Sequence, residues 1–418
     1  MQYHRRMQVQ DSGSVARSDD EFYEKYHVRT DLALEATEVI VEREGPPEIP
    51  GVVVENEETQ YGLINRTQVA TEAGGRAIGK VPGNYVTIES PELRQHSRET
   101  HLEVSKLIAG ELENFFSSLG LGDEDTVLVV GLGNWNATPD ALGPRVIDKL
   151  LVTRHLFTLA PPEMRGGLRP VAAVAPGVLG ITGIETGETV QGIVERIGPK
   201  MIICIDALAS RSTERLCTTV QIADSGIHPG SGIGNMRLGI TPSTMGVPVL
   251  AMGVPTVIHA VTLVSDGMDM ISSAGNGRVE HETNLSSGAG KETVGPSLPS
   301  DTHGTIGTML DPKQIRVTAG PNAAMEAGYL AEFSADTAAN SRMQRLGRRL
   351  AAEGAPGIDQ ATKHQVIRKL LDPYMGTMVV TPKEIDVLMA DAAWVVACGL
   401  NLALHPGMDS EQAAQYTL

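Results

Sequence analysis

Residues 127–140 read VLVVGLGNWNATPD, an apolar run followed by a glycine turn and an aspartate. The apolar run predicts a buried strand, and the glycines predict a tight turn at its end. Residues 201–206, MIICID, repeat the pattern of an apolar run that stops at an aspartate. Amphipathic helical stretches alternate with these runs, residues 99–120 before the first run and residues 187–198 before the second. The alternation predicts an α/β fold, with a mostly parallel sheet covered by helices on both faces.

The rest of the chain divides by composition. Residues 1–31 are polar with few aliphatic side chains, and we expect a detachable arm ahead of an α/β domain over residues 32–418. Residues 32–60 hold eight Glu against the single Arg43, which predicts a solvated acidic face. Residues 272–307 are rich in Gly, Ser and Thr and predict a flexible insertion. The other expected elements are a strand over 248–255 and helices over 143–151, 308–350 and 355–405, the last helix running from Thr381 to about Leu404.

Charge and cysteine content exclude several classes of protein. The formal net charge of −17 argues against a nucleic-acid-binding surface and against docking on an anionic membrane. The three cysteines include no CxxC pair, so we expect a reduced, intracellular protein without disulfides or a thiolate metal cluster. Residues 247–264 carry no charge, but prolines interrupt them, which favours two strands, or a strand and a helix, over a bilayer span. Residues 1–31 have no apolar signal segment, so we expect a soluble protein.

The candidate chemistry lies with the two aspartates that follow apolar runs. Ligands of open α/β sheets bind beyond the carboxyl ends of the strands, where Asp140 and Asp206 fall. A right-handed crossover between the two strands favours their being neighbours, which would bring both carboxylates to one rim. Such a pair can divide into an acid and a base, because repulsion and burial separate the two pKa values. A single aspartate at a strand end is more often a helix N-cap, so the pair strengthens the case for catalysis only modestly.

The other motifs are weaker. GLGN lacks the third glycine of a dinucleotide fingerprint, because position 136 is Asn, and we therefore expect no nicotinamide site. His228 lies in a glycine-rich loop and is equally well read as a loop residue or as a site residue. The chain has no HExxH, GxSxG or P-loop motif. Taken by themselves, these residues indicate an α/β hydrolase-like enzyme without naming its reaction.

Several longer strings carry a resemblance to a known family, the germination proteases of endospore-forming bacteria. They are VRTDLALEATE (28–38), GLGNWNATPDALGPRV (131–146), VTRHLF (152–157), PGVLGITGIET (176–186), IDALASRS (205–212), DSGIHPGSGIGN (224–235) and MVVTPKEID (378–386). The resemblance runs from about residue 23 to the NLALH string near the C-terminus, except over residues 272–307. It implies a fold like that of the hydrogenase maturation proteases, a homotetramer, and location in the cytoplasm of the forespore and spore core. It also implies an endopeptidase that degrades small, acid-soluble spore proteins at germination.

The resemblance assigns roles to particular residues. The family's catalytic pair falls on Asp140 and Asp206, with no cofactor and no metal. Asn134, Asn136 and His228 are candidates for lining the site. Two alternatives stay open: metal-assisted hydrolysis with Asp140, Asp206 and His228 as ligands, and a non-enzymatic spore chaperone or scaffold.

The resemblance also implies a zymogen that removes its own N-terminal arm. The family's processing bond falls between Asp31 and Leu32. Asp31 supplies the acidic residue that the family prefers before the cut, while Leu32 and Ala33 supply an apolar residue and an alanine after it. Val28 stands where the family favours an acid, which predicts slow, regulated cleavage.

Overall fold

A computed structural model gives the fold of the chain. It describes residues 30–44, 49–159, 161, 165–228, 238–265, 267–268, 315–318, 366, 369 and 378–417. The chain divides into two compact units, one of residues 27–259 with 380–418 and one of residues 1–26 with 260–379. The arm before residue 30 and the predicted insertion at 272–307 lie outside the described residues, so the division into an arm, a domain and an insertion stays a prediction.

The smaller unit, residues 1–26 with 260–379, contains strand β9 (Ile315–Thr318). The prediction of helix over 308–350 is wrong at these four residues. Their sequence is IRVT, and β-branched side chains favour a strand over a helix.

The larger unit is built on one mixed sheet. Its strands follow the order β1-β2-β3-β7-β8-β6-β4-β5. Their bounds are β1 (Val52–Thr59), β2 (Gly62–Val69), β3 (Gly83–Glu89), β4 (Val127–Gly131), β5 (Val171–Val174), β6 (Met201–Ser210), β7 (Thr219–Ala223) and β8 (Val249–His259). The pairs β4–β5, β4–β6 and β6–β8 are parallel, whereas β1–β2, β2–β3, β3–β7 and β7–β8 are antiparallel. The α/β class is confirmed, but the sheet is mixed rather than mostly parallel, and the likeness to hydrogenase maturation proteases stays a prediction.

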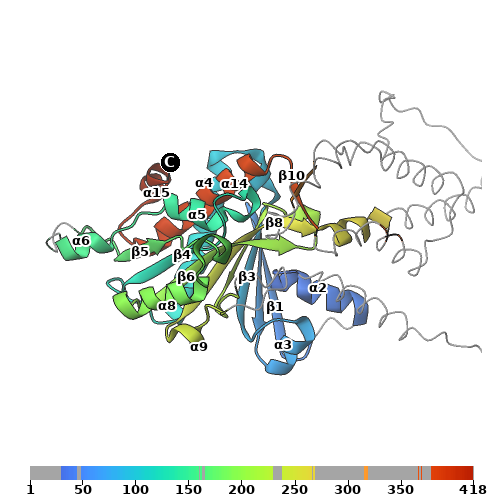
Figure 1. Cartoon of the computed structure of the whole chain (residues 1–418), viewed down its shortest axis with the longest axis horizontal. Coiled ribbons are helices and arrows are strands. Elements are labelled where there is room, and N and C mark those ends of the chain that lie inside the picture. Colours follow the sequence, from blue (N-terminus) through green and yellow to red (C-terminus); the bar gives the residue numbers. More distant parts are fainter. Residues whose placement is uncertain are drawn as a thin grey trace, which may run out of the picture. The chain divides into compact units, whose positions relative to one another are not determined.

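Helices cover both faces of the parallel half, as the apolar strands predicted. α4 (Arg98–Ser118), α5 (Leu142–Asp148) and α14 (Ile385–Leu404) pack on one face, and α8 (Thr186–Ile197) with α9 (Pro242–Met245) pack on the other (Figure 1). Successive residues of β4 alternate between the two cores: Val127 and Val129 face α4 and α14, while Leu128 and Val130 face α8. This alternation explains why the strand reads as a continuous apolar run.

The remaining helices are short. They are α2 (Ala33–Glu44), α3 (Glu72–Ile78), α6 (Arg154–Leu159), α7 (Leu179–Thr182) and α15 (Ser410–Tyr416), with 3₁₀ turns η1 (Pro91–Gln95), η2 (Thr138–Asp140) and η4 (Thr213–Arg215). The predicted helices over 99–120, 143–151 and 187–198 correspond to α4, α5 and α8. The helix predicted from Thr381 begins instead at Ile385, because Val379–Pro382 form strand β10, which pairs with β8.

Two apolar stretches bear on the membrane question. β8 occupies residues 249–259 of the uncharged stretch, and residues 260–265 are helical, which agrees with the predicted strand and helix. Among the described helices, only α14 is long and apolar enough to cross a membrane, and 78% of its apolar window is buried inside the protein. Gly399 of α14 explains the close packing with α4, because an added Cβ would lie only 2.8 Å from the Ile108 side chain. Burial of this kind is typical of the core helix of a globular domain.

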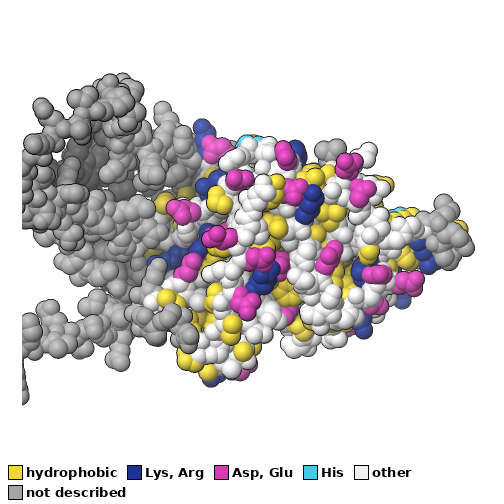
Figure 2. All heavy atoms as spheres, turned by 180° about the vertical axis from the view of Figure 1, so that it is seen from behind, with side chains coloured by type: hydrophobic (Ala, Val, Ile, Leu, Met, Phe, Trp, Pro, Cys, Tyr) yellow, Lys and Arg dark blue, Asp and Glu magenta, His cyan; other side chains and the backbone are white. Residues whose placement is uncertain are grey.

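The surface reflects the acidic composition. Acidic side chains are spread over the described face of Figure 2, with basic side chains among them. The strong negative charge of the chain, −17 in total, is therefore not gathered on one element of this face.

Candidate active site

Asp140 is held by a loop that requires glycine. β4 ends at Gly131, where an added Cβ would lie 2.3 Å from the carbonyl oxygen of Gly143 in α5. Gly133 has a φ of +109°, and an added Cβ there would lie 2.0 Å from the carbonyl oxygen of Asp140. The glycines of GLGN therefore allow the chain to fold back tightly around Asp140. This role accounts for the motif without a dinucleotide.

The predicted site-lining asparagines also shape this loop. The Asn134 backbone N–H donates to the Asp140 carbonyl over 2.9 Å, and the Asn134 side chain accepts from the Asn136 N–H over 3.0 Å. Thr256 of β8 donates its hydroxyl to the Pro139 carbonyl over 2.6 Å. Asn134 thus fixes the loop from within, and β8 fixes it from the sheet, so that Asp140 lies at the rim.

Asp206 lies on the neighbouring strand, as the crossover argument predicted. β6 continues to Ser210, so Asp206 is inside the strand rather than at its end. However, β4 pairs with β6 only as far as Gly131 opposite Ile205, which makes Asp206 the first residue of β6 beyond β4. One carboxyl oxygen accepts the Ala207 N–H over 2.9 Å, and the side chain stays partly accessible.

Burial and a neighbouring carboxylate both raise the pKa of Asp206. Burial raises the pKa of the Asp206 carboxyl well above its usual range, and the nearby Asp140 carboxylate raises it further. The Ala207 hydrogen bond opposes this rise in pKa, and Asp31 adds a smaller increase. The structure therefore places the Asp140 carboxylate close enough to Asp206 to raise the pKa of its carboxyl group.

The segment around the predicted processing bond lies against the same strand. The Asp31 N–H donates to the Ala209 carbonyl over 3.0 Å, and the Asp31 carboxylate accepts the Ala209 N–H over 2.8 Å. Leu32 and Ala33 are both fully buried. The Asp31–Leu32 bond thus docks on β6, at a residue three positions past Asp206.

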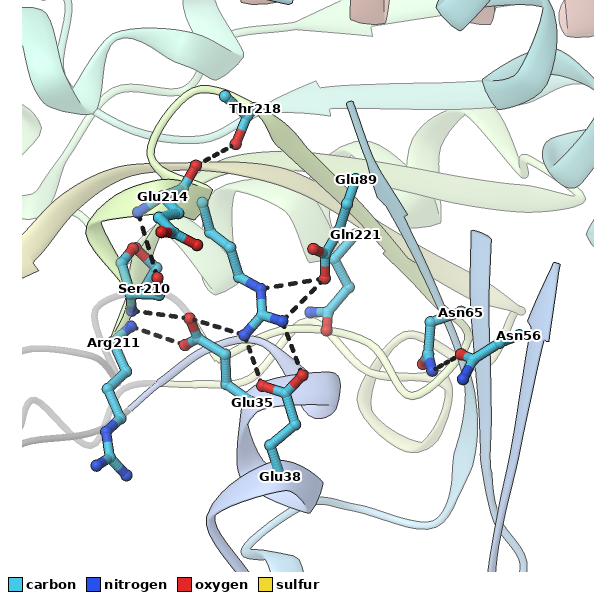
Figure 3. Close-up of polar contacts among 12 residues, drawn as sticks. Glu35, Glu38, Asn56, Asn65, Glu89, Ser210, Arg211, Glu214, Thr218 and Gln221 are labelled. Carbon is cyan, nitrogen blue, oxygen red and sulfur yellow. Dashed lines mark hydrogen bonds and ion pairs between the residues drawn. The ribbon is translucent and has the colours of Figure 1, made fainter. Parts of the chain in front are cut away.

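Helix α2 holds this segment in place through buried charge. Glu35 is only 2% exposed and accepts the N–H groups of Arg211 and Ser212 over 2.7 and 2.9 Å. Glu35, Glu38 and Glu89 converge on the guanidinium of Arg215 (Figure 3), with N···O distances of 3.4, 2.7 and 3.0 Å.

This cluster corrects the prediction of a solvated acidic face over residues 32–60 at Glu35, whereas Glu55, Glu57 and Glu58 of β1 are exposed as predicted. Glu35 is buried because backbone donors and Arg215 satisfy its carboxylate, and Glu38 shares the same cation. Arg215 was not predicted from the sequence, and neither were Lys80 and Gln221, which contact the processing segment. All three lie outside any recognisable motif.

Comparison with known proteins identifies the family. The family model described as germination protease matches residues 33–290 and 341–417. The germination protease of Priestia megaterium is 41% identical over 398 residues, which cover 94% of this chain and 98% of the relative. Those of Bacillus cereus strain G9842 and of Geobacillus sp. strain WCH70 are each 39% identical, over 94% of this chain and 98% and 97% of their own lengths. The chain belongs to the germination protease family.

Membership confirms the resemblance drawn from the sequence strings and makes this protein a peptidase. The family model leaves residues 291–340 unmatched, a stretch that overlaps the predicted insertion at 272–307. The family match begins at residue 33, the second residue after the predicted processing bond.

His228, the third ligand of the metal alternative, packs against a glycine. Its ring packs beside Gly239, where an added Cβ would lie 2.7 Å from Nε2. Within the described part of the chain, no group of three or more His, Cys, Asp or Glu side chains is placed to hold a metal ion. The roles of the pair, of His228 and of a metal-free site remain predictions.

Proposed function

We propose that this germination protease is an endopeptidase that starts the degradation of small, acid-soluble spore proteins in the cytoplasm of the germinating spore. It is made as a zymogen in the forespore, removes residues 1–31 itself, and works as a homotetramer. Asp140 and Asp206 activate the attacking water without a metal. Nucleic acids and membranes are not its partners.

One observation carries this proposal: a substrate-like segment docks on β6, the strand that carries Asp206, and the Asp140 carboxylate lies near that aspartate. Asp140 raises the pKa of Asp206, which places the two carboxyl groups within electrostatic reach of each other. Asp31 is hydrogen-bonded to Ala209 of the strand that carries Asp206. An acidic residue followed by Leu32 and Ala33 is thus held where a substrate would lie.

The two aspartates have different roles. Because its pKa is raised, Asp206 is the member that keeps the proton, and it serves as the general acid. Asp140 is the ionised partner and takes a proton from the attacking water. When the peptide bond breaks, Asp206 protonates the leaving nitrogen. The pair requires one proton, so cleavage is expected to be faster in mild acid than in base.

The test of zymogen processing is N-terminal sequencing of the purified full chain after incubation at pH 5–6 and at pH 8. We expect a new N-terminus at Leu32, faster at the lower pH, in the presence of chelator as in its absence. The Asp206→Asn variant should stay intact. A different N-terminus, equal cutting of Asp206→Asn, or loss of cutting on chelation would contradict self-processing by a metal-free pair.

The substrate and the assembly need separate measurements. The chain beginning at Leu32 should cut a purified acid-soluble spore protein after an acidic residue, as mass spectrometry of the fragments would establish. Light scattering coupled to size-exclusion chromatography should give the mass of four chains. A monomer with full activity would remove the tetramer from the proposal while leaving the peptidase intact.

A further inference from the structure

The strand register places three residues in one row across the sheet. Asp206 of β6 pairs with Gly253 of β8, and Gly253 pairs with Gln221 of β7. Paired residues project from the same face, so the Asp206 and Gln221 side chains lie on one face with a glycine between them. Their backbones are about 10 Å apart, since each strand spacing is about 4.8 Å. A peptide bond can therefore lie between the two side chains.

The peptide at this place is the one between Asp31 and Leu32. The Asp31 carbonyl oxygen accepts two hydrogen bonds, from Lys80 Nζ over 2.9 Å and from Gln221 Nε2 over 2.9 Å. The other end of the Gln221 amide accepts the Ala33 N–H over 2.7 Å. Gln221 thus spans the bond, contacting the residue before it and the second residue after it.

We propose that Lys80 and Gln221 form the oxyanion-binding site for cleavage of the Asp31–Leu32 bond. The inference rests on the proposed self-processing. A carbonyl oxygen that accepts from one ammonium and one amide is placed as a reacting carbonyl must be, because negative charge gathers on that oxygen as water attacks. Lys80 and Gln221 are then catalytic residues, since they touch a reacting atom.

The reaction balances with water as the only added reactant. The water oxygen bonds to the Asp31 carbonyl carbon, its proton passes to Asp140, and the electron pair of the C=O bond moves to the oxygen held by Lys80 and Gln221. The tetrahedral intermediate then collapses. The bond to the Leu32 nitrogen breaks, and Asp206 donates its proton to that nitrogen. The products are a carboxyl group on Asp31 and an amino group on Leu32.

The surroundings of Lys80 suit this role. The side chain is half-buried, and burial lowers the pKa of its ammonium group, while the carboxylates of Asp31 and Glu35 raise it. Lys80 also donates to the Thr30 carbonyl over 2.9 Å. A cation in a partly water-excluded site interacts more strongly with a developing oxyanion than it would in bulk water.

The experiment measures the first-order rate at which the full-length chain yields the Leu32 N-terminus, in wild type and in three variants. Lys80→Met removes the cationic donor, and Lys80→Arg restores one. Gln221→Glu keeps the acceptor for the Ala33 N–H and removes the donor to the Asp31 carbonyl. Loss of one oxyanion donor is expected to slow cleavage by about 10²–10³-fold. Lys106→Met, which removes an exposed lysine of α4, is the matched control and should leave the rate unchanged.

A second readout separates catalysis from docking. Hydrogen exchange of the Asp31 and Ala33 amides, which donate to Ala209 and to Gln221, reports whether the segment stays bound. The measurement uses an Asp206→Asn background, so that every chain stays uncut. We expect Gln221→Glu and Lys80→Met to keep this protection, and Lys80→Arg to recover part of the cleavage rate.

The outcomes are distinct. Wild type that is never cut between Asp31 and Leu32 overturns the proposed self-processing, and this inference with it. Wild type that is cut, with Lys80→Met and Gln221→Glu within about threefold of its rate, overturns the oxyanion site alone, because a lost donor costs far more. Slow cleavage with lost exchange protection also overturns it, since the two residues would then only hold the segment.

Discussion

The two halves of the sheet differ in what they contribute. The parallel half, β5-β4-β6-β8, carries Asp140 and Asp206 where its neighbouring strands stop pairing. The antiparallel half, β1-β2-β3-β7, carries Gln221, and the turn before β3 carries Lys80. Both halves reach the segment around Asp31. The parallel half pairs with Asp31 through Ala209 and carries Asp206 nearby, and the antiparallel half donates to the Asp31 carbonyl.

The two halves thus differ in function: one carries the groups that transfer protons, and the other carries the donors to the Asp31 carbonyl. Groups that exchange protons lie on parallel strands, whose carboxyl ends form the usual reactive rim of an α/β sheet. The donors to the Asp31 carbonyl come from the antiparallel half, whereas Asp31 is also anchored by Ala209 of β6 and helix α2 by Arg215 of the β6–β7 connection. Substitutions at the carboxyl pair should therefore lower the cleavage rate, whereas a substitution at Glu35, which anchors α2, should lower stability.

The largest effect is expected from the carboxyl pair. Asp140→Asn and Asp206→Asn should each lower the rate of self-processing by at least about 10²–10⁴-fold, because each removes a proton-transfer group. The hydrogen bonds that hold the segment around Asp31 should remain, so its amides should keep their exchange protection. Asp148→Asn, an exposed change in α5, is the control. Near-normal turnover in either pair variant would mean that the chemistry lies elsewhere.

Removal of the Glu35 carboxylate should weaken the anchoring of helix α2 and destabilise the fold. Glu35→Leu takes away a buried carboxylate that accepts two backbone N–H groups and pairs with Arg215, at an expected cost of about 3–5 kcal/mol in unfolding free energy. Glu38 contacts the same guanidinium but is 44% exposed, so Glu38→Leu should cost only about 0.2–1 kcal/mol. Urea unfolding measures both. Equal losses of unfolding free energy in the two variants would show that the burial of Glu35 does not determine how strongly α2 is anchored.

A smaller effect should appear in the pH dependence of stability. The pKa of Asp206 is raised in the folded state, so this group favours folding below its unfolded pKa of about 3.9 and loses that contribution as pH rises through the folded value. Asp206→Asn should therefore be more stable than wild type at pH 8. The difference should disappear below about pH 4. Thermal unfolding across this range checks the sign, and a variant less stable than wild type at pH 8 would contradict it.

The smallest effect is expected at the outer edge of the antiparallel half. Arg66 of β2 pairs with Glu57 of β1 over 2.8 Å, with side chains 34% and 54% exposed. Glu57→Gln should cost about 0.2–1 kcal/mol, and less in high salt, because exposed ion pairs are screened. Self-processing should be unchanged. A slower rate of self-processing in this variant would show that the edge strand also contributes to cleavage, although it does not contact the segment.

The parallel half could be predicted from the sequence because its signals are local. The apolar runs ahead of Asp140 and Asp206 marked two buried strands, and the crossover rule made them neighbours. The end of β6 was misplaced because a polar residue interrupts the apolar run while the strand continues. The hairpin of β1 and β2 gave no such signal, since the side chains of β1 are mostly exposed.

The groups that hold the peptide were beyond sequence reasoning for a different reason. Lys80 and Gln221 meet at one carbonyl oxygen although 141 positions separate them in the chain. Neither belongs to a motif. The register of β7, β8 and β6 brings Gln221 into one row with Asp206, and Lys80 reaches the same carbonyl oxygen from the turn before β3. Glu35 looked like one member of an acidic run, because its partners follow β6, far along the chain.

The anchoring of the processing segment is uneven on the two sides of the Asp31–Leu32 bond. After the bond come buried Leu32 and Ala33 and the ion-paired helix α2, whereas the described residues before it, Thr30 and Asp31, are only part-buried. Cleavage would leave the downstream end fixed and turn the upstream end into a separate peptide. While it is tethered, the upstream segment has a roughly millimolar effective concentration at the site. After cleavage its concentration at the site falls to that of the free peptide in solution. Maturation would therefore be effectively irreversible because the released peptide diffuses away, and not because of the free energy of peptide hydrolysis.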